Sequence, residues 1–424
     1  MKTLRCGFSR RIITPTEEER KSIVQDGYGF RVRPCDGVRD DLYVQVCSFS
    51  EGERVFLLFS FDLCGMNPKL YKTMSACLSS MTGVPVSSMA LSCTHTHSGP
   101  TGGVLAINPI DWDYFYRVSL VAAEAAQEAM KRAVPGHFDC GFTGEFLSCG
   151  NRRDGREVRD PRILTAIFSD ESGRVRGGIA CGACHAVINT SLKISADYLS
   201  YLHEMASDEM PILYLEGRGA DIDPTDKTED VMRRLGQELC SAVKKGIRQR
   251  TNASPEKASF VRTYKRVDIP VLPTPGKKEI AALRKQYLEQ FAEIHELGMA
   301  RHYTTNELNY LYCMEQYAGR RKLTVPVQFF SPSRGLLFVF LPFELLTLTG
   351  NKIEEIARGK GYDANGIFVA GYTNSVHSYL PPAEEFAYGG YEVDVASHWY
   401  GFPDYSPDSE GALLAWVEKN LPER

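Results

Sequence analysis

The segment Cys93-Thr94-His95-Thr96-His97-Ser98-Gly99-Pro100 follows a short apolar run, residues 88–92, and leads into a glycine-rich turn. If the apolar run is a strand, residues two apart point to the same face, so His95 and His97 project together beyond its end. Neutral imidazole is a common metal ligand and also moves protons near neutral pH. An isolated His-x-His is more often structural, but the small residues of 98–103 let the backbone approach a ligand closely. The segment therefore indicates a metal site or a catalytic site.

Length, composition and charge limit the classes of protein to which the chain can belong. The chain of 424 residues is long enough for one large core or for two to three domains. Its 43% hydrophobic and 24% charged residues are ordinary for a globular protein. The net charge of −4, from 49 basic and 53 acidic residues, and the lack of a basic stripe interleaved with aromatic residues disfavour nucleic-acid binding. No run approaches the ~20 apolar residues of a membrane span. The first residues lack the apolar core of a secretory signal, so we expect a cytoplasmic enzyme.

The twelve cysteines are scattered through apolar segments, which in a reducing compartment indicates buried free thiols. One pattern, Cys181-Gly182-Ala183-Cys184-His185, matches the motifs for covalent haem attachment and for a redox dithiol. Haem attachment of this kind requires export, and a dithiol site begins a helix, whereas this motif lies in an extended apolar run. We interpret the two cysteines as core residues and His185 as the functional member.

The hydrophobic pattern predicts an α/β protein with mixed β-sheets and flanking helices. Strands are expected at 42–49, 54–61, 88–93, 138–149, 162–168, 174–188, 210–215, 260–271, 323–330, 335–341 and 366–369. Helices are expected at 68–81, 112–133, 228–248, 277–297, 305–317, 345–357 and 412–421. We expect one catalytic unit over residues 1–424, with residues 256–320 as a helical sub-domain or insertion within it.

Three further segments place polar side chains where apolar strands end. His185 interrupts an apolar strand, and a buried histidine needs a partner, which a metal supplies unless the residue is structural. Glu344, in Pro342-Phe343-Glu344, follows a very apolar strand, so either a cation neutralises it or it is an ordinary acid at a helix N-terminus. The polar and aromatic residues 371–382 are typical of a site wall and equally of a surface loop.

The motif T-H-T-H-S-G-P-x-G-G at residues 94–103 resembles the amino-terminal metal motif of the neutral ceramidases, zinc amidases that cleave the fatty-acyl amide of ceramide. The resemblance extends from about Gly7 to Tyr400 and implies a neutral ceramidase-like catalytic domain. Three further matches are Ala183–Val187 to A-x-H-[AP]-V, Pro342–Glu344 to P-x-E, and the loop around His377–Leu380. The implied zinc ligands are His95, His185, Glu344 and Tyr379.

The resemblance also implies residues that act on the substrate. Tyr391 matches a tyrosine near the scissile carbonyl. His97 matches the second histidine of the motif, and Arg152 matches the arginine of an N-R pair. The resemblance implies that both contact the substrate or its oxyanion. Two imidazoles, a carboxylate and a phenol oxygen suit Zn²⁺ and leave room for a water.

Two features depart from the family. Asp223, in Ala220–Thr225, stands where the family has its nucleophilic serine. A carboxylate that attacked an amide would form a labile anhydride, so attack by water activated by zinc is the simpler chemistry. Asp223 is then a general base or acid, an anchor for a cationic group, or only a cap of the following helix. We also expect the carboxy-terminal immunoglobulin-like domain of the family to be absent, which favours a small soluble substrate over ceramide.

The sequence thus predicts a zinc-dependent hydrolase that cleaves a non-peptide amide C–N bond of a small molecule by metal-activated water. An ester or lactone hydrolase is the nearest alternative, since the same Lewis acid serves both bonds. A zinc-containing binding protein without catalysis is a second. Metal-free binding of carbohydrate or lipid is a third, and it requires the four implied ligands to lie apart. Homo-oligomerisation stays open.

Overall fold

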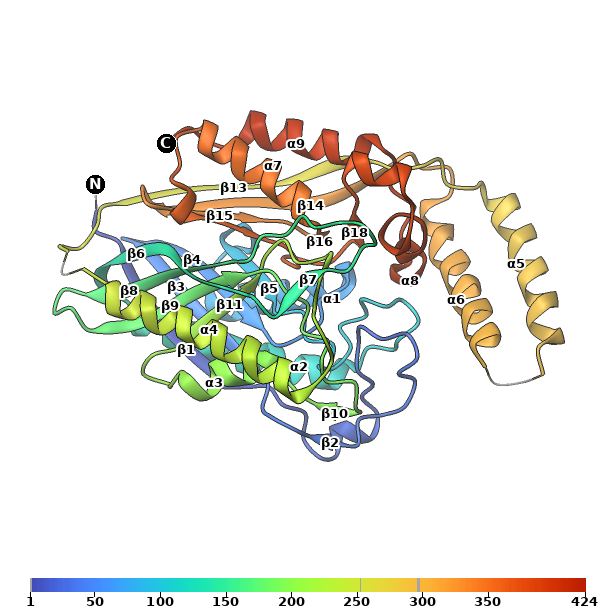
Figure 1. Ribbon diagram of the computed structural model, residues 1–424, viewed down its shortest axis with the longest axis horizontal. Coiled ribbons are helices and arrows are strands. Elements are labelled where there is room, and N and C mark those ends of the chain that lie inside the picture. The colour runs from blue at the N-terminus through green and yellow to red at the C-terminus, as the bar shows by residue number, and fades with distance from the viewer. Residues whose placement is uncertain (1, 252, 296–297) are drawn as a thin grey trace.

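The computed structural model describes residues 2–251, 253–295 and 298–424. Two β-sheets stack on one another and helices cover the outer face of each, so the chain forms four layers (Figure 1). In the larger sheet β4 and β5 are parallel, as are β9 and β11, and the other neighbours are antiparallel. Its eight strands, in order of adjacency, are β11 (Ile212–Glu216), β9 (Val175–Gly182), β8 (Arg162–Asp170), β6 (Val134–Glu145), β1 (Arg5–Ile12), β3 (Tyr43–Glu51), β4 (Arg54–Phe61) and β5 (Met89–Cys93).

The smaller sheet has four strands, β13 (Ala258–Pro270), β14 (Lys322–Ser333), β15 (Leu336–Phe340) and β17 (Ile367–Ala370). Buried aromatic and aliphatic side chains fill the space between the two sheets. The rings of Phe56 and Phe330 stack across this interface with centroids 3.8 Å apart. The burial of large apolar side chains from both sheets is the main stabilising contribution here. The predicted α/β class with mixed sheets and flanking helices is confirmed.

Amphipathic helices cover the outer faces. The larger sheet is covered by α1 (Pro68–Thr82), α2 (Trp112–Lys131), α3 (Ser200–Met205) and α4 (Glu229–Gln249), and the smaller by α7 (Thr347–Gly359) and α9 (Asp408–Asn420). In α2 the buried residues recur at helical spacing, and Asp111 caps the helix by accepting a hydrogen bond from the Tyr114 amide. No helix in the described residues is both long and apolar enough to span a bilayer.

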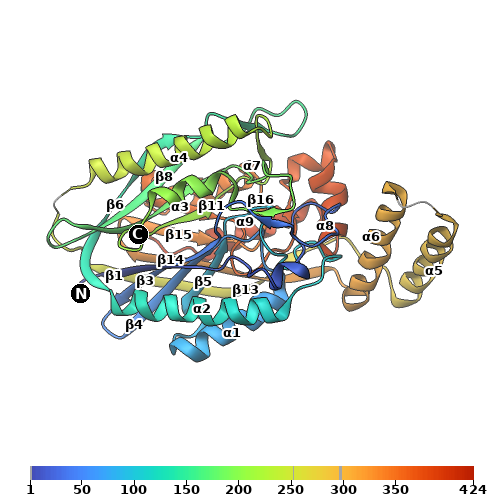
Figure 2. The same ribbon diagram turned by 90° about the horizontal axis from the view of Figure 1, so that it is seen from below.

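Two helices, α5 (Lys277–Glu293) and α6 (Met299–Met314), form a hairpin between β13 and β14. It projects from one end of the molecule beside α8 (Ala396–Tyr400), as Figures 1 and 2 both show. A small separate apolar cluster, Ile280, Tyr310, Leu311 and Met314, holds the hairpin together. The predicted helical region therefore begins with a strand of the smaller sheet, and its helices lie within 277–314. The organisation as one catalytic unit stays a prediction.

Some expected elements end earlier than the apolar pattern suggests. The strand expected at 174–188 stops at Gly182, because the amide of His185 instead donates to the carbonyl of Ile222 outside the sheet. The strand expected at 138–149 is divided into β6 and the short β7 (Cys149–Asn151). The twelve cysteines are all free and most are buried, as predicted.

The loops that follow five strands meet at one place. The loop after β5 is bound to the loop after β17 by the Cys93 amide, which donates to the Tyr372 carbonyl at 3.1 Å. The Gly371 amide donates to the carbonyl of Glu216, at the end of β11, also at 3.1 Å. The loop after β9, which carries His185, and the segment after β15, which leads into Glu344 at the start of the short strand β16, join the same group. Both sheets thus contribute side chains to a single site.

Candidate metal centre and its cavity

His95 lies two residues beyond β5, where the backbone leaves the sheet with a φ of 62°. Its imidazole is buried, and Nδ1 donates a hydrogen bond to the carbonyl of Cys64 at 2.7 Å. A carbonyl only accepts, so Nδ1 carries the proton and the Nε2 lone pair can bind a cation. His95 and His97 project together beyond the end of the strand, as expected, but not through strand alternation, because β5 ends at Cys93. A left-handed turn brings the two rings together instead.

His185 follows β9 by three residues and is fully buried. Its Nδ1 donates to the carbonyl of Gly219 at 2.7 Å, which fixes the same tautomer as in His95. Within the part of the chain that the structure describes, His185 Nε2 has no hydrogen-bond partner. A buried polar atom without a partner costs about 1–3 kcal/mol, and a cation bound at Nε2 would remove this cost.

Glu344 lies in the short strand β16 (Glu344–Leu345) and is fully buried. Its Oε2 atom lies 3.5 Å from His95 Nε2 and 3.4 Å from His185 Nε2. The donor atoms of these three residues all lie within 4.8 Å of one another. Glu344 is not the acid at the start of a helix, because α7 begins at Thr347 and its N-cap is Leu346. The structure therefore brings together three of the four residues implied as metal ligands through their ligating atoms.

Two tyrosines that sequence reasoning did not single out hold the carboxylate of Glu344. The hydroxyl of Tyr372 donates to Oε2 at 3.2 Å, and the hydroxyl of Tyr400 donates to Oε1. The ring of Tyr372 also lies against the imidazole of His95, with centroids 4.2 Å apart. Tyr372 falls within the polar loop that the sequence marked as a site wall, whereas no sequence signal pointed to Tyr400.

Burial and neighbouring groups set the protonation of the site. Burial lowers the pKa of His95 to about 4 and that of His97 well below its usual range. Burial alone would raise the pKa of Glu344, but His95, His185 and the Tyr400 hydroxyl bring it down to about 2. Neutral imidazoles beside an ionised carboxylate are the protonation state that metal ligands require.

Tyr379 lies beside Glu344 through the pairing of β18 (Tyr379–Leu380) with β16, a parallel pair in which the two residues are direct partners. Partners in a parallel pair direct their side chains to the same face. The Tyr379 hydroxyl accepts a hydrogen bond from Arg152 Nη2 at 3.1 Å, and burial raises the pKa of the phenol well above its usual range. The fourth implied ligand thus lies on the same side as Glu344 as a neutral phenol.

Arg152 connects Tyr379 to two carboxylates. Its Nη1 donates to Asp223 Oδ1 at 3.3 Å and its Nε donates to Glu392 Oε1 at 2.9 Å. Tyr391 lies on the same side, with its ring centroid 5.6 Å from that of Tyr379 and 5.9 Å from Arg152 Cζ. Glu392 was not among the predicted site residues, although it follows Tyr391 directly.

Asp223 lies in β12 (Ile222–Pro224), which pairs with β7 so that Asp223 faces Gly150. Its carboxylate is partly exposed, and Oδ1 is 3.8 Å from His185 Nδ1. The interpretation of Asp223 as a helix cap is wrong, because Thr228 caps α4 by accepting a hydrogen bond from the Val231 amide. Asp223 therefore stands beside the histidine and carboxylate cluster with one oxygen held by Arg152.

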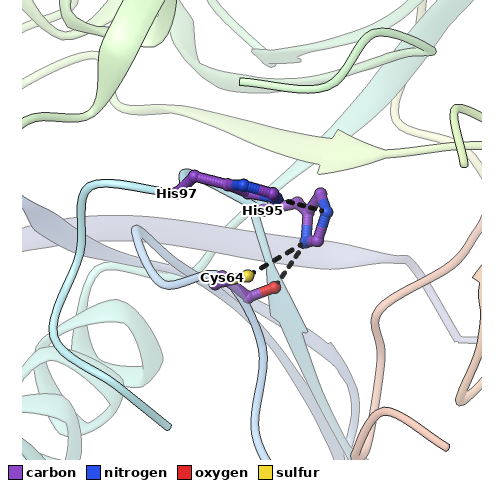
Figure 3. A group of neighbouring side chains, drawn as sticks. All are labelled: Cys64, His95 and His97. Carbon is purple, nitrogen blue, oxygen red and sulfur yellow. Dashed lines mark hydrogen bonds between the residues drawn. The ribbon is translucent and has the colours of Figure 1, made fainter. Parts of the chain in front are cut away.

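His97 and Cys64 form a second group with His95, which Figure 3 shows. His97 Nε2 lies 3.1 Å from His95 Nε2, while Cys64 Sγ lies 3.6 Å from His95 Nδ1. That nitrogen already donates its proton to the Cys64 carbonyl, and burial raises the pKa of the Cys64 thiol well above its usual range. Because a metal binds the thiolate form, this second group is the poorer metal site.

A cavity of about 660 Å³ opens over the cluster. His97, Arg152, Asp223, Tyr379 and Tyr391, all predicted site residues, line it. Aromatic side chains form much of the remaining wall, among them Tyr28, Phe30, Tyr303 of α6 and Trp399 of α8. The hairpin of α5 and α6 thus contributes to the cavity. His95, His185 and Glu344 lie beneath this wall, fully buried.

Comparisons with known proteins bear on the fold. No protein-family model matches the chain, and no curated protein matches it. Among solved structures, a neutral ceramidase from Pseudomonas aeruginosa is similar, with a TM-score of 0.75 and 17% identity over 99% of this chain and 74% of that one. A ceramidase complexed with C2 is similar with a TM-score of 0.73 and 16% identity over 100% of this chain and 76% of that one. The resemblance found in the sequence motifs is confirmed at the level of the fold, and the chain has the fold of the neutral ceramidases.

Proposed function

We propose that the protein is a zinc-dependent hydrolase that cleaves a non-peptide amide C–N bond of a small molecule. The observation that carries the proposal is the convergence of His95, His185 and Glu344 beneath one cavity, with their ligating atoms within 4.8 Å of one another and His185 Nε2 lacking a partner in the described residues. The similarity to ceramidase structures supports amide hydrolysis as the reaction class.

The residues present fit Zn²⁺. Two imidazoles and a carboxylate are a common donor set for catalytic zinc, and the Tyr379 phenol is a fourth donor group nearby. Both imidazoles are oriented by backbone carbonyls, those of Cys64 and Gly219, through Nδ1. When bound, Zn²⁺ would polarise the acyl oxygen of the substrate and lower the pKa of water enough for nucleophilic attack near neutral pH.

Asp223 is the proposed general base and acid. Its carboxylate lines the cavity beside His185, where it can accept a proton from the attacking water. The C–N bond then breaks, and the same proton passes to the leaving nitrogen, so that amide and water give a carboxylic acid and an amine. Arg152 positions Asp223 by donating to Oδ1 and leaves Oδ2 to the reacting proton.

Arg152, His97 and Tyr391 are the proposed contacts for the negative charge that develops on the acyl oxygen. Arg152 is fixed on one side by Glu392, so its guanidinium is held in place before the substrate binds. The ordinary pKa of a tyrosine is about 10, so the phenol of Tyr391 is protonated near neutral pH and can donate. His97 Nε2 lies next to His95 Nε2 and is therefore within reach of any group that binds there.

The test combines metal analysis with a matched pair of substrates, an N-alkyl hexanamide and the corresponding hexanoate ester. We expect one zinc ion per chain and turnover of the amide. Asp223→Asn should lower kcat by about 100-fold or more while zinc content is unchanged. The matched control is Asp226→Asn, an exposed aspartate of the same loop, which should retain activity.

Other outcomes of this test would change the proposed function or the proposed mechanism. Brisk turnover of the ester without any cleavage of an amide would make the protein an ester or lactone hydrolase. Bound zinc without turnover of either substrate would make it a non-catalytic zinc protein. Equal activity of wild type and Asp223→Asn would remove Asp223 from the mechanism.

A further inference from the structure

Tyr28 lies between two cations at one wall of the cavity. The Lys227 Nζ atom is 4.8 Å and the Arg31 Cζ atom 4.7 Å from the centroid of its ring. Lys227 Nζ also donates to the Tyr28 hydroxyl at 2.7 Å, and that hydroxyl donates to the Val187 carbonyl at 2.6 Å. Because the Tyr28 hydroxyl donates its proton to the Val187 carbonyl, its oxygen is free to accept the hydrogen bond from Lys227. The ammonium group of Lys227 is thereby held in a defined place.

Neither cation forms an ion pair with a carboxylate in the described residues. Arg31 is buried, and its two terminal nitrogens donate to the backbone carbonyls of His97 and Asn189. In residues 2–251, 253–295 and 298–424 no Asp or Glu oxygen lies within 4.0 Å of a side-chain nitrogen of Arg31 or Lys227. A buried guanidinium without a directly paired counter-ion leaves a positive potential at the adjacent wall, which Asp197 offsets only from beyond 4.0 Å.

The other cations of the cavity differ in this respect. Arg152 is paired with Glu392 at 2.9 Å, and Arg153 and Arg156 are paired with Glu385 at 2.8 Å and 3.1 Å. The carboxylate of Asp223 is shared with Arg152. Asp154, the remaining carboxylate of the lining, lies in the turn that carries these arginines. Four carboxylates thus face three arginines on that side, whereas Lys227 forms no ion pair in the described residues and is acted on by Asp223 and Asp197 only from beyond 4.0 Å.

This wall is close to the reacting centre. The ring of Tyr28 meets that of His97 edge to face with centroids 5.1 Å apart, and His97 Nε2 is 3.1 Å from His95 Nε2. Gly27, Tyr28, Lys227 and Asp223 all line the same cavity. A substrate whose acyl group reaches the metal cluster can therefore place a second group against Lys227.

We propose that Lys227, held by the Tyr28 hydroxyl and reinforced by the charge of Arg31, binds a carboxylate of the substrate, so that the substrate is an acyl amide with an anionic group. An ammonium has three donors, of which the tyrosine takes one, so two remain for a ligand. The inference rests on the proposed function, whose substrate class it specifies. The carboxylate belongs either to the amine part, as in an N-acyl amino acid, or to the acyl part, as in the monoamide of a dicarboxylic acid.

The test compares matched substrates with the zinc-loaded enzyme. N-hexanoylglycine carries the carboxylate on the amine side, the N-butyl monoamide of adipic acid carries it on the acyl side, and N-hexanoylglycinamide is neutral. We expect kcat/KM for one of the acids to exceed that for the neutral amide by about tenfold or more, because a charge-assisted hydrogen bond at a partly exposed site is worth about that factor. The acid that is preferred identifies the side of the amide that faces Lys227.

Variants separate the effect of charge from that of shape. Lys227→Met should lower the ratio of acid to neutral kcat/KM by about tenfold, and Lys227→Arg should restore most of it. The matched control is Arg156→Met, which removes a cation of the same cavity that is already paired with Glu385, and it should leave the ratio unchanged within about twofold. A wild-type ratio near one, or a ratio that Lys227→Met does not change, overturns the inference.

Equilibrium binding keeps the inference apart from the proposed reaction. In 4-oxononanoic acid a methylene replaces the amide nitrogen of N-hexanoylglycine, so the compound cannot be cleaved, and 4-oxononanamide is its neutral partner. Calorimetry should show about tenfold tighter binding of the acid than of its amide to wild type, with 6-oxoundecanoic acid and its amide as the pair if the acyl-side acid is preferred, and Lys227→Met should abolish the preference. Selective binding without turnover of any amide would retain the anion site and reject the proposed hydrolase. Turnover of amides without selectivity for the acids would do the opposite.

Discussion

Glu344 and Tyr379 are direct partners in the parallel pair β16 and β18, so a carboxylate and a phenol that lie far apart in the sequence project from neighbouring backbones. The pairing is supported by the Glu344 amide, which donates to the Ser378 carbonyl at 3.0 Å. Tyr379 is in turn tied to Arg152. Tyr379, the proposed uncharged metal ligand, is thereby held between Glu344 of the metal cluster and Arg152, the proposed substrate contact.

Tyr379→Phe tests this role. The change removes only the hydroxyl, so the buried ring keeps its packing. We expect zinc affinity, measured by competition with a chelator, to fall about 10- to 100-fold, because one oxygen of the set is lost. Tyr405→Phe is the matched control, since it removes the hydroxyl of another buried tyrosine, one that donates to the His377 carbonyl. Unchanged zinc affinity in Tyr379→Phe would mean that the phenol is not a ligand.

Gly27→Ala tests the placement of His97. Gly27 has a φ of 85°, and a Cβ atom there would lie 2.2 Å from His97 Cγ. The ring must move, and we expect kcat/KM to fall by about 100-fold, since a shift of about 1 Å at a reacting centre has that effect. Zinc content should stay the same.

The control for this change is Gly83→Ala. Gly83 has a φ of 73°, and no atom of the described residues lies within 4 Å of a Cβ placed there, so Gly83→Ala adds backbone strain without a steric contact. Gly83→Ala should lower the free energy of unfolding by about 1 kcal/mol and retain full activity. Activity of Gly27→Ala equal to that of Gly83→Ala would show that the position of His97 does not matter.

The sequence predicted which side chains gather at the site better than it predicted why. His95, His185 and Glu344 were identified because each ends an apolar strand within a family-like motif, and the structure brings them together. His95 and His97 meet through a turn with positive φ, which the strand pattern of the segment does not reveal. The carbonyls of Cys64 and Gly219 and the hydroxyl of Tyr400 are positioned only by long-range folding, and a backbone carbonyl leaves no mark in the residue type.

Removal of metal should destabilise the protein. Without a cation, the carboxylate of Glu344 stays buried, and so does Nε2 of His185, which has no hydrogen-bond partner in the described residues. We expect a chelator to lower Tm by several degrees and added zinc to restore it, since a ligand bound only to the folded state contributes about 4 kcal/mol at 1,000 times its Kd. In Glu344→Gln the chelator should have little effect, because the site no longer binds the ion tightly. Equal shifts in wild type and Glu344→Gln would place the metal elsewhere.

The hairpin of α5 and α6 is attached to the cavity wall through His398 of α8, and this attachment should depend on pH. His398 Nδ1 lies 2.9 Å from Glu307 Oε1 of α6, and Nε2 lies 3.7 Å from Asp404 Oδ1. Burial works against protonation, but Asp404 and Glu307 raise the pKa of His398 to about 9. The folded state thus holds the proton more tightly than the unfolded state, whose histidine pKa is about 6.5.

The stabilisation by His398 is therefore complete below about pH 6.5 and is lost as the pH rises through about 9. In urea unfolding, the free energy of unfolding of wild type should exceed that of His398→Gln by about 2 kcal/mol at pH 6. This value is discounted because His398 is partly exposed. At pH 10 the two free energies of unfolding should be almost equal. The comparison variant is His295→Gln, an exposed histidine near the tip of the hairpin, which should show no such pH dependence. A difference between wild type and His398→Gln that stays constant from pH 6 to pH 10 would show that His398 acts through its stacking on Tyr310, at 3.9 Å between ring centroids, and not through its charge.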